Sequence, residues 1–369
     1  MGPHHASERS GRPLFLGSYP ITPATDILHE LAKRKDLGVT AVQMEDEIAG
    51  VCSAIGASFA GDLAVTSTSG PGLALKGEGI GLAVIAELPL VIIDVMRGGP
   101  STGMPTKTEQ TDLMQALYGR NGESPLCVLA ATTPTNCFDM AFEAARIAIE
   151  HMTPVILLTD AFIGNGSSAW RVPEADEYPE IHPRFVPESL REAGSPISAT
   201  KNRWYATGRC PAPSSCTAWA ALKRTARQEP YPPTQPTTKR WWHCAARKWP
   251  ASPTTYPGRK CSATRMPTRC CSAGAAHTDT FAPPPASSTP PVYPMAFTQL
   301  AYINPLPRNM GEIMSRYKRV IVAELNSGMC AEYLQARFPA THIDRINKVQ
   351  GQPFQVSEIV DKVREILGK

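Results

Sequence analysis

Three acidic residues, Glu45, Asp46 and Glu47, follow an apolar run at residues 39–42 and precede a stretch rich in alanine and glycine. Small residues such as Gly50 allow a backbone or a ligand to approach closely. A carboxylate at a turn from strand to helix, beside such residues, suits a buried acid that contacts a cofactor. We therefore predict Glu47 as the first catalytic candidate.

A simpler role is open to the other two acids. Glu45 and Asp46 precede the expected helix, where negative charge complements the positive end of the helix dipole. We favour that role for both of them.

Other candidate groups lie at similar turns along the chain. Gly70 and Gly72 flank a proline after an apolar run, and such glycines either let backbone N–H groups approach a ligand or form a plain turn. Arg97 follows the next apolar run; it is either solvated or, beside Thr22, a clamp for a carboxylate. His151 falls at an expected helix end, which favours a role as a dipole partner over catalysis.

The elements that would position these groups alternate along the chain. Apolar runs typical of strands occur at residues 14–18, 39–44, 63–67, 89–95, 126–130 and 155–159. Helical patterns occur at residues 24–33, 47–59, 73–86, 108–118 and 136–150. Apolar strands that alternate with helices predict a parallel sheet covered on both faces, with ligands beyond the carboxyl ends of its strands. Every group named above except His151 lies at such an end.

Four ordered motifs carry a resemblance to a known family. They are Gly17-Ser18-Tyr19-Pro20-Ile21-Thr22-Pro23, Met44-Glu45-Asp46-Glu47, Thr66-Ser67-Thr68-Ser69-Gly70-Pro71-Gly72 and Arg97-Gly98-Gly99-Pro100-Ser101-Thr102-Gly103. In this order and spacing they resemble the alpha subunit of the 2-oxoacid:ferredoxin oxidoreductases, most of all the 2-oxoglutarate enzymes. The resemblance covers residues 6–184 and resumes from residue 297 to the end. Four motifs in order are more specific than one glycine pattern.

The resemblance implies a fold and a set of site residues. The fold is α/β: a doubly wound parallel-sheet domain of the pyrimidine type that binds thiamine diphosphate, then a disordered or aberrant segment and a partial second α/β domain like the transketolase C-terminal domain. Glu47 would hydrogen-bond the aminopyrimidine of the cofactor, in a cofactor-binding set completed by Thr68, Ser69 and Gly70. Tyr19, Thr22 and Arg97 would bind the substrate, with Ile21 shaping the pocket. No metal ligand is expected on this chain.

The resemblance also implies partners. The family decarboxylates a 2-oxoacid on thiamine diphosphate, forms an acyl-CoA and passes electrons to ferredoxin. A beta subunit would supply the diphosphate site, Mg²⁺ and a 4Fe-4S cluster; the sequence has no Gly-Asp-Gly metal motif and no cysteine cluster of its own. A gamma-type domain that many relatives carry would be a separate chain or lost.

The sequence favours a cytoplasmic protein with neither membrane nor nucleic-acid partner. The start lacks the apolar segment of a secretory signal, and Glu87 and Asp94 interrupt the best apolar run. Cys52, Cys127, Cys137 and Cys330 are scattered among apolar residues, as expected of free core thiols.

One segment differs in composition from the rest of the 369 residues. Residues 198–291 hold 14 Lys and Arg against two acids, six of the ten cysteines, five of the six tryptophans and 15 prolines; Leu222 is their only Ile, Val or Leu. So few aliphatic residues cannot offset the entropy of ordering the chain. We predict three regions: the cofactor-binding domain at 1–185, a linker with the anomalous segment at 186–295, and part of a second domain at 296–369.

The anomalous segment has the character of an out-of-frame translation. Tryptophan has the single codon TGG, so reading one base earlier across Trp241-Trp242-His243-Cys244 gives Leu, Met or Val, then Val, Ala and Leu. This resembles the Met-Val-Ala-Leu helix of the family at the same place. We predict frame changes near residues 188–200 and 292–297. A genuine disordered, proline-rich insert is the alternative.

Two other functions stay open. The basic segment interleaves Trp204, Trp219, Trp241 and Trp242 with Arg and Lys, as single-strand nucleic-acid sites do, although no recognisable fold supports such a platform. The chain could also be a non-catalytic remnant of the family subunit.

Overall fold

A computed structural model describes residues 1–183, 269–273 and 295–368 of the protein. Its larger part is a seven-stranded sheet in the order β2-β1-β3-β4-β6-β5-β9. Six strands run parallel, and β9 joins β5 antiparallel. The strands are β1 Leu14–Ser18, β2 Thr40–Gln43, β3 Leu63–Thr68, β4 Leu90–Met96, β5 Cys127–Ala130, β6 Pro154–Asp160 and β9 Tyr302–Asn304.

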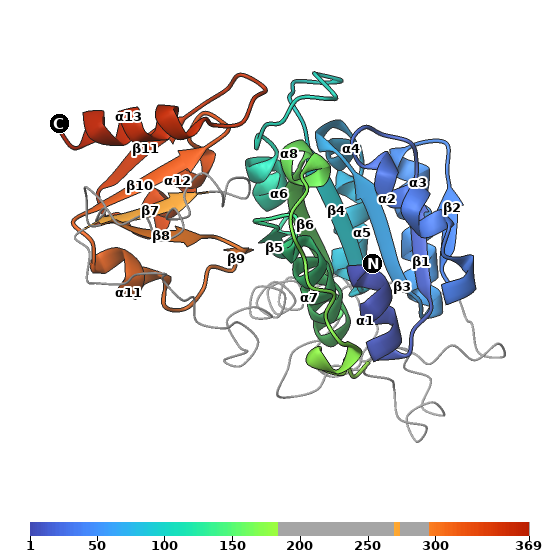
Figure 1. Ribbon diagram of the computed structural model, residues 1–369. Helices are drawn as coiled ribbons and strands as arrows, with labels where there is room; N and C mark the ends of the chain where they lie inside the picture. The colour runs from blue at the N-terminus through green and yellow to red at the C-terminus, as the bar shows by residue number, and fades with distance from the viewer. Residues whose placement is uncertain (184–268, 274–294, 369) are drawn as a thin grey trace.

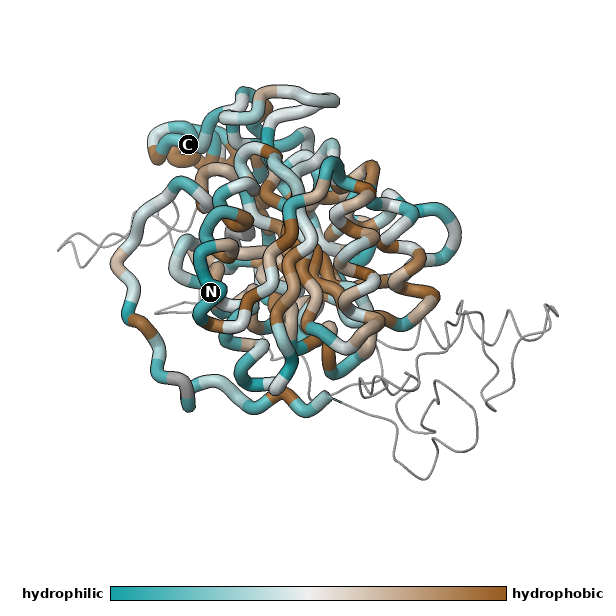
Figure 2. The backbone as a smooth tube through the Cα atoms, turned by 90° about the vertical axis from the view of Figure 1, so that its right-hand side faces the viewer, coloured by the Kyte–Doolittle hydropathy of each residue, from teal (hydrophilic) through white to brown (hydrophobic). Residues whose placement is uncertain are grey.

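Helices cover both faces of this sheet, which confirms the doubly wound α/β fold (Figure 1). One face packs on α1 Gly2–Ser10, α2 Thr25–Ala32 and α7 Asn136–His151. The other face packs on α3 Glu47–Ala60, α4 Gly70–Leu75, α5 Gly77–Ala86 and α6 Leu113–Tyr118. Alternate residues of each central strand enter the two cores, and Figure 2 shows the apolar residues gathered along these strands.

A second, smaller sheet has the order β11-β10-β7-β8, with all neighbours parallel. Its strands are β7 Arg269–Ala273, β8 Met295–Gln299, β10 Arg319–Glu324 and β11 Ile343–Asn347, and its helices are α11 Met310–Ser315, α12 Met329–Arg337 and α13 Val356–Ile366. Short helices α8 Ala161–Asn165, η1 Lys35–Leu37 and η2 Ala175–Glu177 complete the described elements.

Strand β7 corrects one expectation from the sequence. It lies inside the anomalous segment, where we expected no strand, yet it pairs with both β10 and β8. Parallel pairing uses backbone N–H and C=O groups, which every residue type other than proline provides in full, so a segment without aliphatic side chains can still fill a sheet position. The rest of that segment, including the expected disorder, lies outside the described residues.

The two sheets are joined close to the Arg97 loop. The backbone N–H of Gln110 donates to the carbonyl of Leu325 (2.9 Å), and the Gln110 side-chain oxygen accepts from the N–H of Leu325 (3.0 Å). The Asn326 amide donates to the Gln110 carbonyl (2.8 Å). Helix α12 adds Ala331 and Leu334 to the core on the α3 face of the first sheet. The second sheet therefore fixes the segment that leads out of the Arg97 loop.

Several element boundaries differ from those expected. The helical pattern at residues 73–86 divides into α4 and α5, with Lys76 between them, and the pattern at residues 108–118 becomes helical at Leu113. Cys127 and Cys330 are buried, as expected of core cysteines, whereas Cys137 is partly buried and Cys52 is exposed on α3. Within the described residues, no helix combines the length and apolarity needed to cross a bilayer.

Candidate active site

The predicted site residues gather at the carboxyl edge of the first sheet. Tyr19 and Thr22 follow β1, Glu47 follows β2, Ser69 follows β3 and Arg97 follows β4. These strands are neighbours in the order β2-β1-β3-β4, so their ends meet along one edge. The sheet thus brings together residues that are far apart in the sequence.

Glu47 begins helix α3 and is partly buried. Asp46 is the N-cap of that helix, and its carboxylate accepts a hydrogen bond from the backbone N–H of Ala49 (2.7 Å). The helix-start role predicted for Asp46 is therefore confirmed. Glu45 is exposed. Glu47 is therefore the acid of the three that lies in the first helical turn and is partly buried.

Gly72 marks the point at which three site residues converge. A Cβ atom added there would lie 2.0 Å from the Tyr19 hydroxyl, 2.2 Å from the Thr68 hydroxyl and 2.8 Å from Cγ of Glu47. The two hydroxyls share a hydrogen bond of 3.0 Å. Burial raises the pKa of Tyr19, and the Glu47 carboxylate raises it further. Tyr19 therefore stays protonated at neutral pH and keeps a proton to donate beside Glu47.

The turn after β3 contains a hydroxyl group that has no hydrogen-bond partner among the described residues. Ser69 is fully buried, and its hydroxyl has no hydrogen-bond partner within the described part of the chain. Gly70 lies against Asp112, whose carboxyl oxygen would be 2.4 Å from a Cβ at this position. A buried hydroxyl without a partner, in the turn between Thr68 and Gly72, offers a hydrogen bond to the polar edge of an aminopyrimidine ring. The residues present are thus compatible with thiamine diphosphate.

Arg97 is buried, with 7% of its surface exposed, and reaches Thr22 as predicted. Its guanidinium donates to the backbone carbonyls of Thr22 (2.6 Å) and Thr102 (2.9 Å), while its Nε has no partner. The contact with Thr22 is made through the main chain, so the threonine hydroxyl is left available. Arg97 is therefore held between Thr22 and Thr102 and is not a solvated loop residue.

Two charged groups near this edge were not predicted from the sequence. Lys76 is completely buried and donates to the Glu47 carbonyl (2.9 Å). Asp94 is also completely buried, and its carboxyl oxygens have no hydrogen-bond partner among the described residues. Lysine and aspartate are seldom fully buried, so composition gave no signal for either. His151 lies in the last turn of α7, where the sequence placed it.

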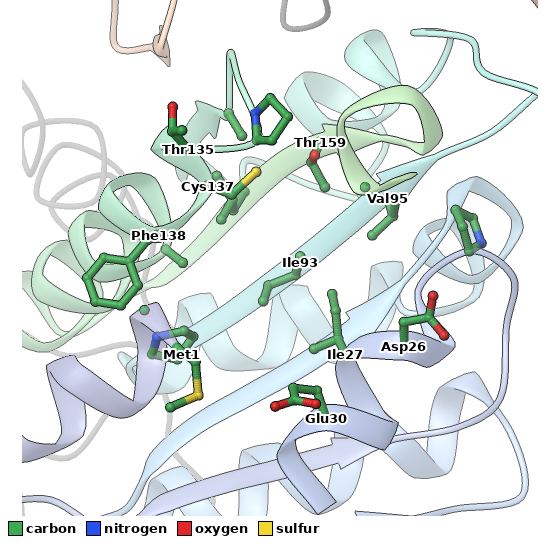
Figure 3. A pocket seen from close by; sticks show the side chains of 18 of the residues that line it. Met1, Asp26, Ile27, Glu30, Ile93, Val95, Thr135, Cys137, Phe138 and Thr159 are labelled. Carbon is green, nitrogen blue, oxygen red and sulfur yellow. The ribbon is translucent and has the colours of Figure 1, made fainter. Parts of the chain in front are cut away.

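A separate cavity of about 420 Å³ lies on the opposite face of the sheet (Figure 3). Figure 3 shows Ile27 and Glu30 of α2 on one side of it and Cys137 and Phe138 of α7 on the other. None of the predicted site residues lines this cavity. Within the described residues, no cluster of His, Cys, Asp and Glu is arranged to hold a metal ion.

Sequence comparison decides the family. A family model described as pyruvate flavodoxin/ferredoxin oxidoreductase, thiamine diphosphate-binding, matches residues 8–215, which is more than half of the chain. The chain belongs to this oxidoreductase family. The match contains all the motifs singled out at the carboxyl edge of the first sheet.

Curated members of the oxidoreductase family resemble the chain closely. The 2-oxoglutarate oxidoreductase subunit KorA of Mycobacterium tuberculosis is 40% identical over 385 positions, which cover 98% of this chain and 55% of the relative. The 2-oxoglutarate synthase subunit KorA of Archaeoglobus fulgidus is 46% identical over 164 residues, 44% of this chain and 47% of the relative. The chain thus matches about half the length of each of these relatives.

Solved structures agree with the family fold. The 2-oxoglutarate:ferredoxin oxidoreductase from Magnetococcus marinus, with 2-oxoglutarate, coenzyme A and succinyl-CoA bound, has a TM-score of 0.86 and 25% identity; the match covers 99% of this chain and 64% of that chain. A split-gene transketolase, an inactive beta4 tetramer, has a TM-score of 0.51 and 12% identity, which speaks for the fold alone.

Proposed function

We propose that the chain is the alpha subunit of a 2-oxoacid:ferredoxin oxidoreductase that acts on 2-oxoglutarate. The reaction would be oxidative decarboxylation to an acyl-CoA, with electrons passed to ferredoxin. The Mycobacterium and Magnetococcus relatives, whose names specify 2-oxoglutarate, support this substrate. The observation that carries the proposal is the convergence of Tyr19, Glu47 and Thr68 at Gly72.

Each site residue has a role that follows from its position. Glu47 would hold the aminopyrimidine through a hydrogen bond and would exchange a proton with it. Thr68, Ser69 and Gly70 would line the same ring, where the Ser69 hydroxyl would gain a partner. Thiamine diphosphate, when bound, acts as the electron sink for decarboxylation.

The substrate side of the site is formed by Arg97, Thr22 and Tyr19. The buried Arg97 guanidinium carries a fixed positive charge that suits a carboxylate of the 2-oxoacid, and its Nε is a donor without a partner in the described structure. We assign Tyr19 and Thr22 to substrate binding through their hydroxyl groups; that of Tyr19 also contacts Thr68 of the cofactor-binding set. Because the surroundings are buried, an ion pair formed there is stronger than one in water.

The proposed partner is a beta subunit that supplies the diphosphate site, Mg²⁺ and the 4Fe-4S cluster. Helix α3 starts at Glu47 and exposes a stripe without charge, made of Ile48, Cys52, Gly56 and Phe59 at helical spacing. Leu75 of α4 is 53% exposed on the same side of the sheet. An uncharged, partly apolar face beside an incomplete site fits a subunit that closes it. A cytoplasmic location, ferredoxin as acceptor and a gamma-type domain or chain are also part of this proposal.

The test is turnover of 2-oxoglutarate by the chain reconstituted with a cognate beta subunit. Glu47→Gln keeps the shape of the side chain but removes its exchangeable proton, so we expect kcat to fall by about 10²-fold or more with folding unchanged. Glu45→Gln, at the exposed neighbour, is the matched control and should keep wild-type turnover. Wild-type turnover in the Glu47→Gln complex would refute the assignment of Glu47.

A further inference from the structure

Lys76 lies next to Glu47 of the candidate site, at the junction of α4 and α5. It is the largest of the fully buried side chains in the described residues. Its ammonium donates to the backbone carbonyl of Glu47 (2.9 Å) and to the hydroxyl of Thr66 (3.1 Å). The same nitrogen lies 5.0 Å from the centre of the Tyr19 ring, within range of a cation–π interaction.

Burying an ammonium group costs free energy, so the presence of Lys76 at this position needs a reason beyond packing. Transfer of an ion from water to a protein interior costs several kcal/mol unless partners compensate. Burial lowers the pKa of Lys76 to about 8, while the nearby carboxylates of Glu47 and Asp46 oppose that decrease. Lys76 therefore carries its charge at neutral pH. A methionine would fill similar space without this cost, so packing alone does not account for a lysine here.

Building on the proposed function, we propose that Lys76 is a positioning residue for Glu47. Its hydrogen bond holds the first peptide of α3 against β3, and its positive charge stabilises the Glu47 carboxylate in the orientation that faces Gly72. Lys76 does not touch the reacting atoms, because its nitrogen contacts the main chain of Glu47 and the Thr66 side chain. It acts on the cofactor through Glu47.

The groups that face Lys76 give the proposal a pH dependence. From α3 they are Glu47, Asp46 and Cys52; from the turn after β1 it is the Tyr19 ring; from β3 it is the uncharged Thr66. As pH rises through about 8, Lys76 loses its proton and Glu47 loses its neighbouring positive charge. The affinity for thiamine diphosphate should fall over the same range.

The experiment measures thiamine diphosphate affinity by calorimetry in the reconstituted complex, as a double-mutant cycle of Lys76→Met and Glu47→Gln. We expect Lys76→Met to weaken binding by about tenfold, and to have no further effect when Glu47→Gln is already present, because the two residues act as one unit. Lys35→Met removes an exposed lysine, and therefore the same formal charge, and should leave affinity unchanged.

Additive effects, or wild-type affinity in Lys76→Met, would overturn the proposal. If Lys76→Met does not fold, the wild-type complex decides: its affinity should fall above pH 8, and that fall should be absent in Glu47→Gln. Equal pH dependence in both proteins would overturn the proposal as well. Should Glu47→Gln itself bind and turn over normally, the proposed function fails instead, so the two failures are distinguishable.

Discussion

Arg97 is a buried cation whose guanidinium holds two turns of the chain together through Thr22 and Thr102. The planar group donates hydrogen bonds to both carbonyls at once and retains further N–H donors for a ligand. The ammonium group of a lysine is a compact point charge and cannot donate to both carbonyls in the same planar arrangement. The sequence predicted the proximity to Thr22, but not that the main chain of Thr22 makes the contact, because backbone direction in a loop has no residue pattern.

Arg97→Lys should therefore raise the KM for 2-oxoglutarate by about tenfold and change kcat less, because the positive charge is kept while the fork is lost. Steady-state kinetics of the reconstituted complex measure both constants. Arg171→Lys, at an exposed arginine paired with Glu177, is the control and should leave KM unchanged. An unchanged KM in Arg97→Lys would remove Arg97 from the substrate site.

Two buried acids, Asp94 and Asp112, lie near this loop. Burial raises the pKa of Asp94 well above its ordinary value, and the neighbouring Asp112 raises it further. Burial likewise raises the pKa of Asp112 to about 6, although Arg97 opposes the change. A carboxyl group with a raised pKa in the folded state stabilises the fold fully below its unfolded pKa of about 3.9. That contribution is lost as pH rises through the folded pKa.

The contribution of these two acids to the free energy of unfolding should thus fall between pH 4 and pH 7, with a share of up to about 3 kcal/mol from Asp112. Asp112→Asn cannot ionise, so it should lose less stability over this range and exceed the wild type at pH 7.5. Urea unfolding at pH 4.5 and 7.5 measures the difference. Asp36→Asn, at an exposed site, should retain the wild-type slope, and an equally steep slope in Asp112→Asn would contradict the account.

Among the secondary-structure elements, the turn from β3 into α4 determines how closely the side chains of the site approach one another. Gly72 has no room for a Cβ atom, whereas Gly81 in α5 has no neighbouring atom within 4 Å of that position. The sequence left open either the close approach of a ligand or a plain turn at Gly70 and Gly72, since glycine permits both. It did not predict the break between α4 and α5, because residues 73–86 have one continuous helical pattern and the buried Lys76 at the break has no apolar signature.

Gly72→Ala should push Tyr19 and Thr68 apart and cost about 1–3 kcal/mol of stability, as overpacking does in well-packed cores. Thiamine diphosphate affinity should fall in the same variant. Gly81→Ala is the matched control: in an open helical position it should stabilise the protein by about 0.5–1 kcal/mol. Thermal and urea unfolding measure both variants, and equal effects would show that the turn at Gly72 is not crowded.

At the scale of the whole molecule, the first sheet was predicted well because its strands are apolar and buried on both faces. The pattern placed β1 at its observed bounds, Leu14–Ser18. Helix α1 was missed because Gly2–Ser10 lacks an apolar period, and β7 was missed because its side chains do not resemble a buried strand. The pairing of β9 with β5 was missed because an antiparallel edge strand from the distant end of the chain leaves no local signal.

The division of the chain at residues 185 and 296 stays a prediction, as does the change of reading frame between them. Sequencing the locus tests the frame directly. We expect two compensating single-base shifts, one near residues 188–200 and one near residues 292–297. An uninterrupted frame across residues 198–291 would contradict this prediction and leave a genuine insert as the explanation.

We propose that this chain forms half of a thiamine diphosphate site that a beta subunit completes. Calorimetric titration of thiamine diphosphate with Mg²⁺ tests this proposal, first on the chain alone and then on the chain with a cognate beta subunit. We predict no tight binding by the chain alone, because Glu47, Thr68 and Ser69 would contact only the pyrimidine side of the cofactor, and tight binding once the beta subunit is added. Tight binding by the chain alone, or none by the complex, would contradict the account.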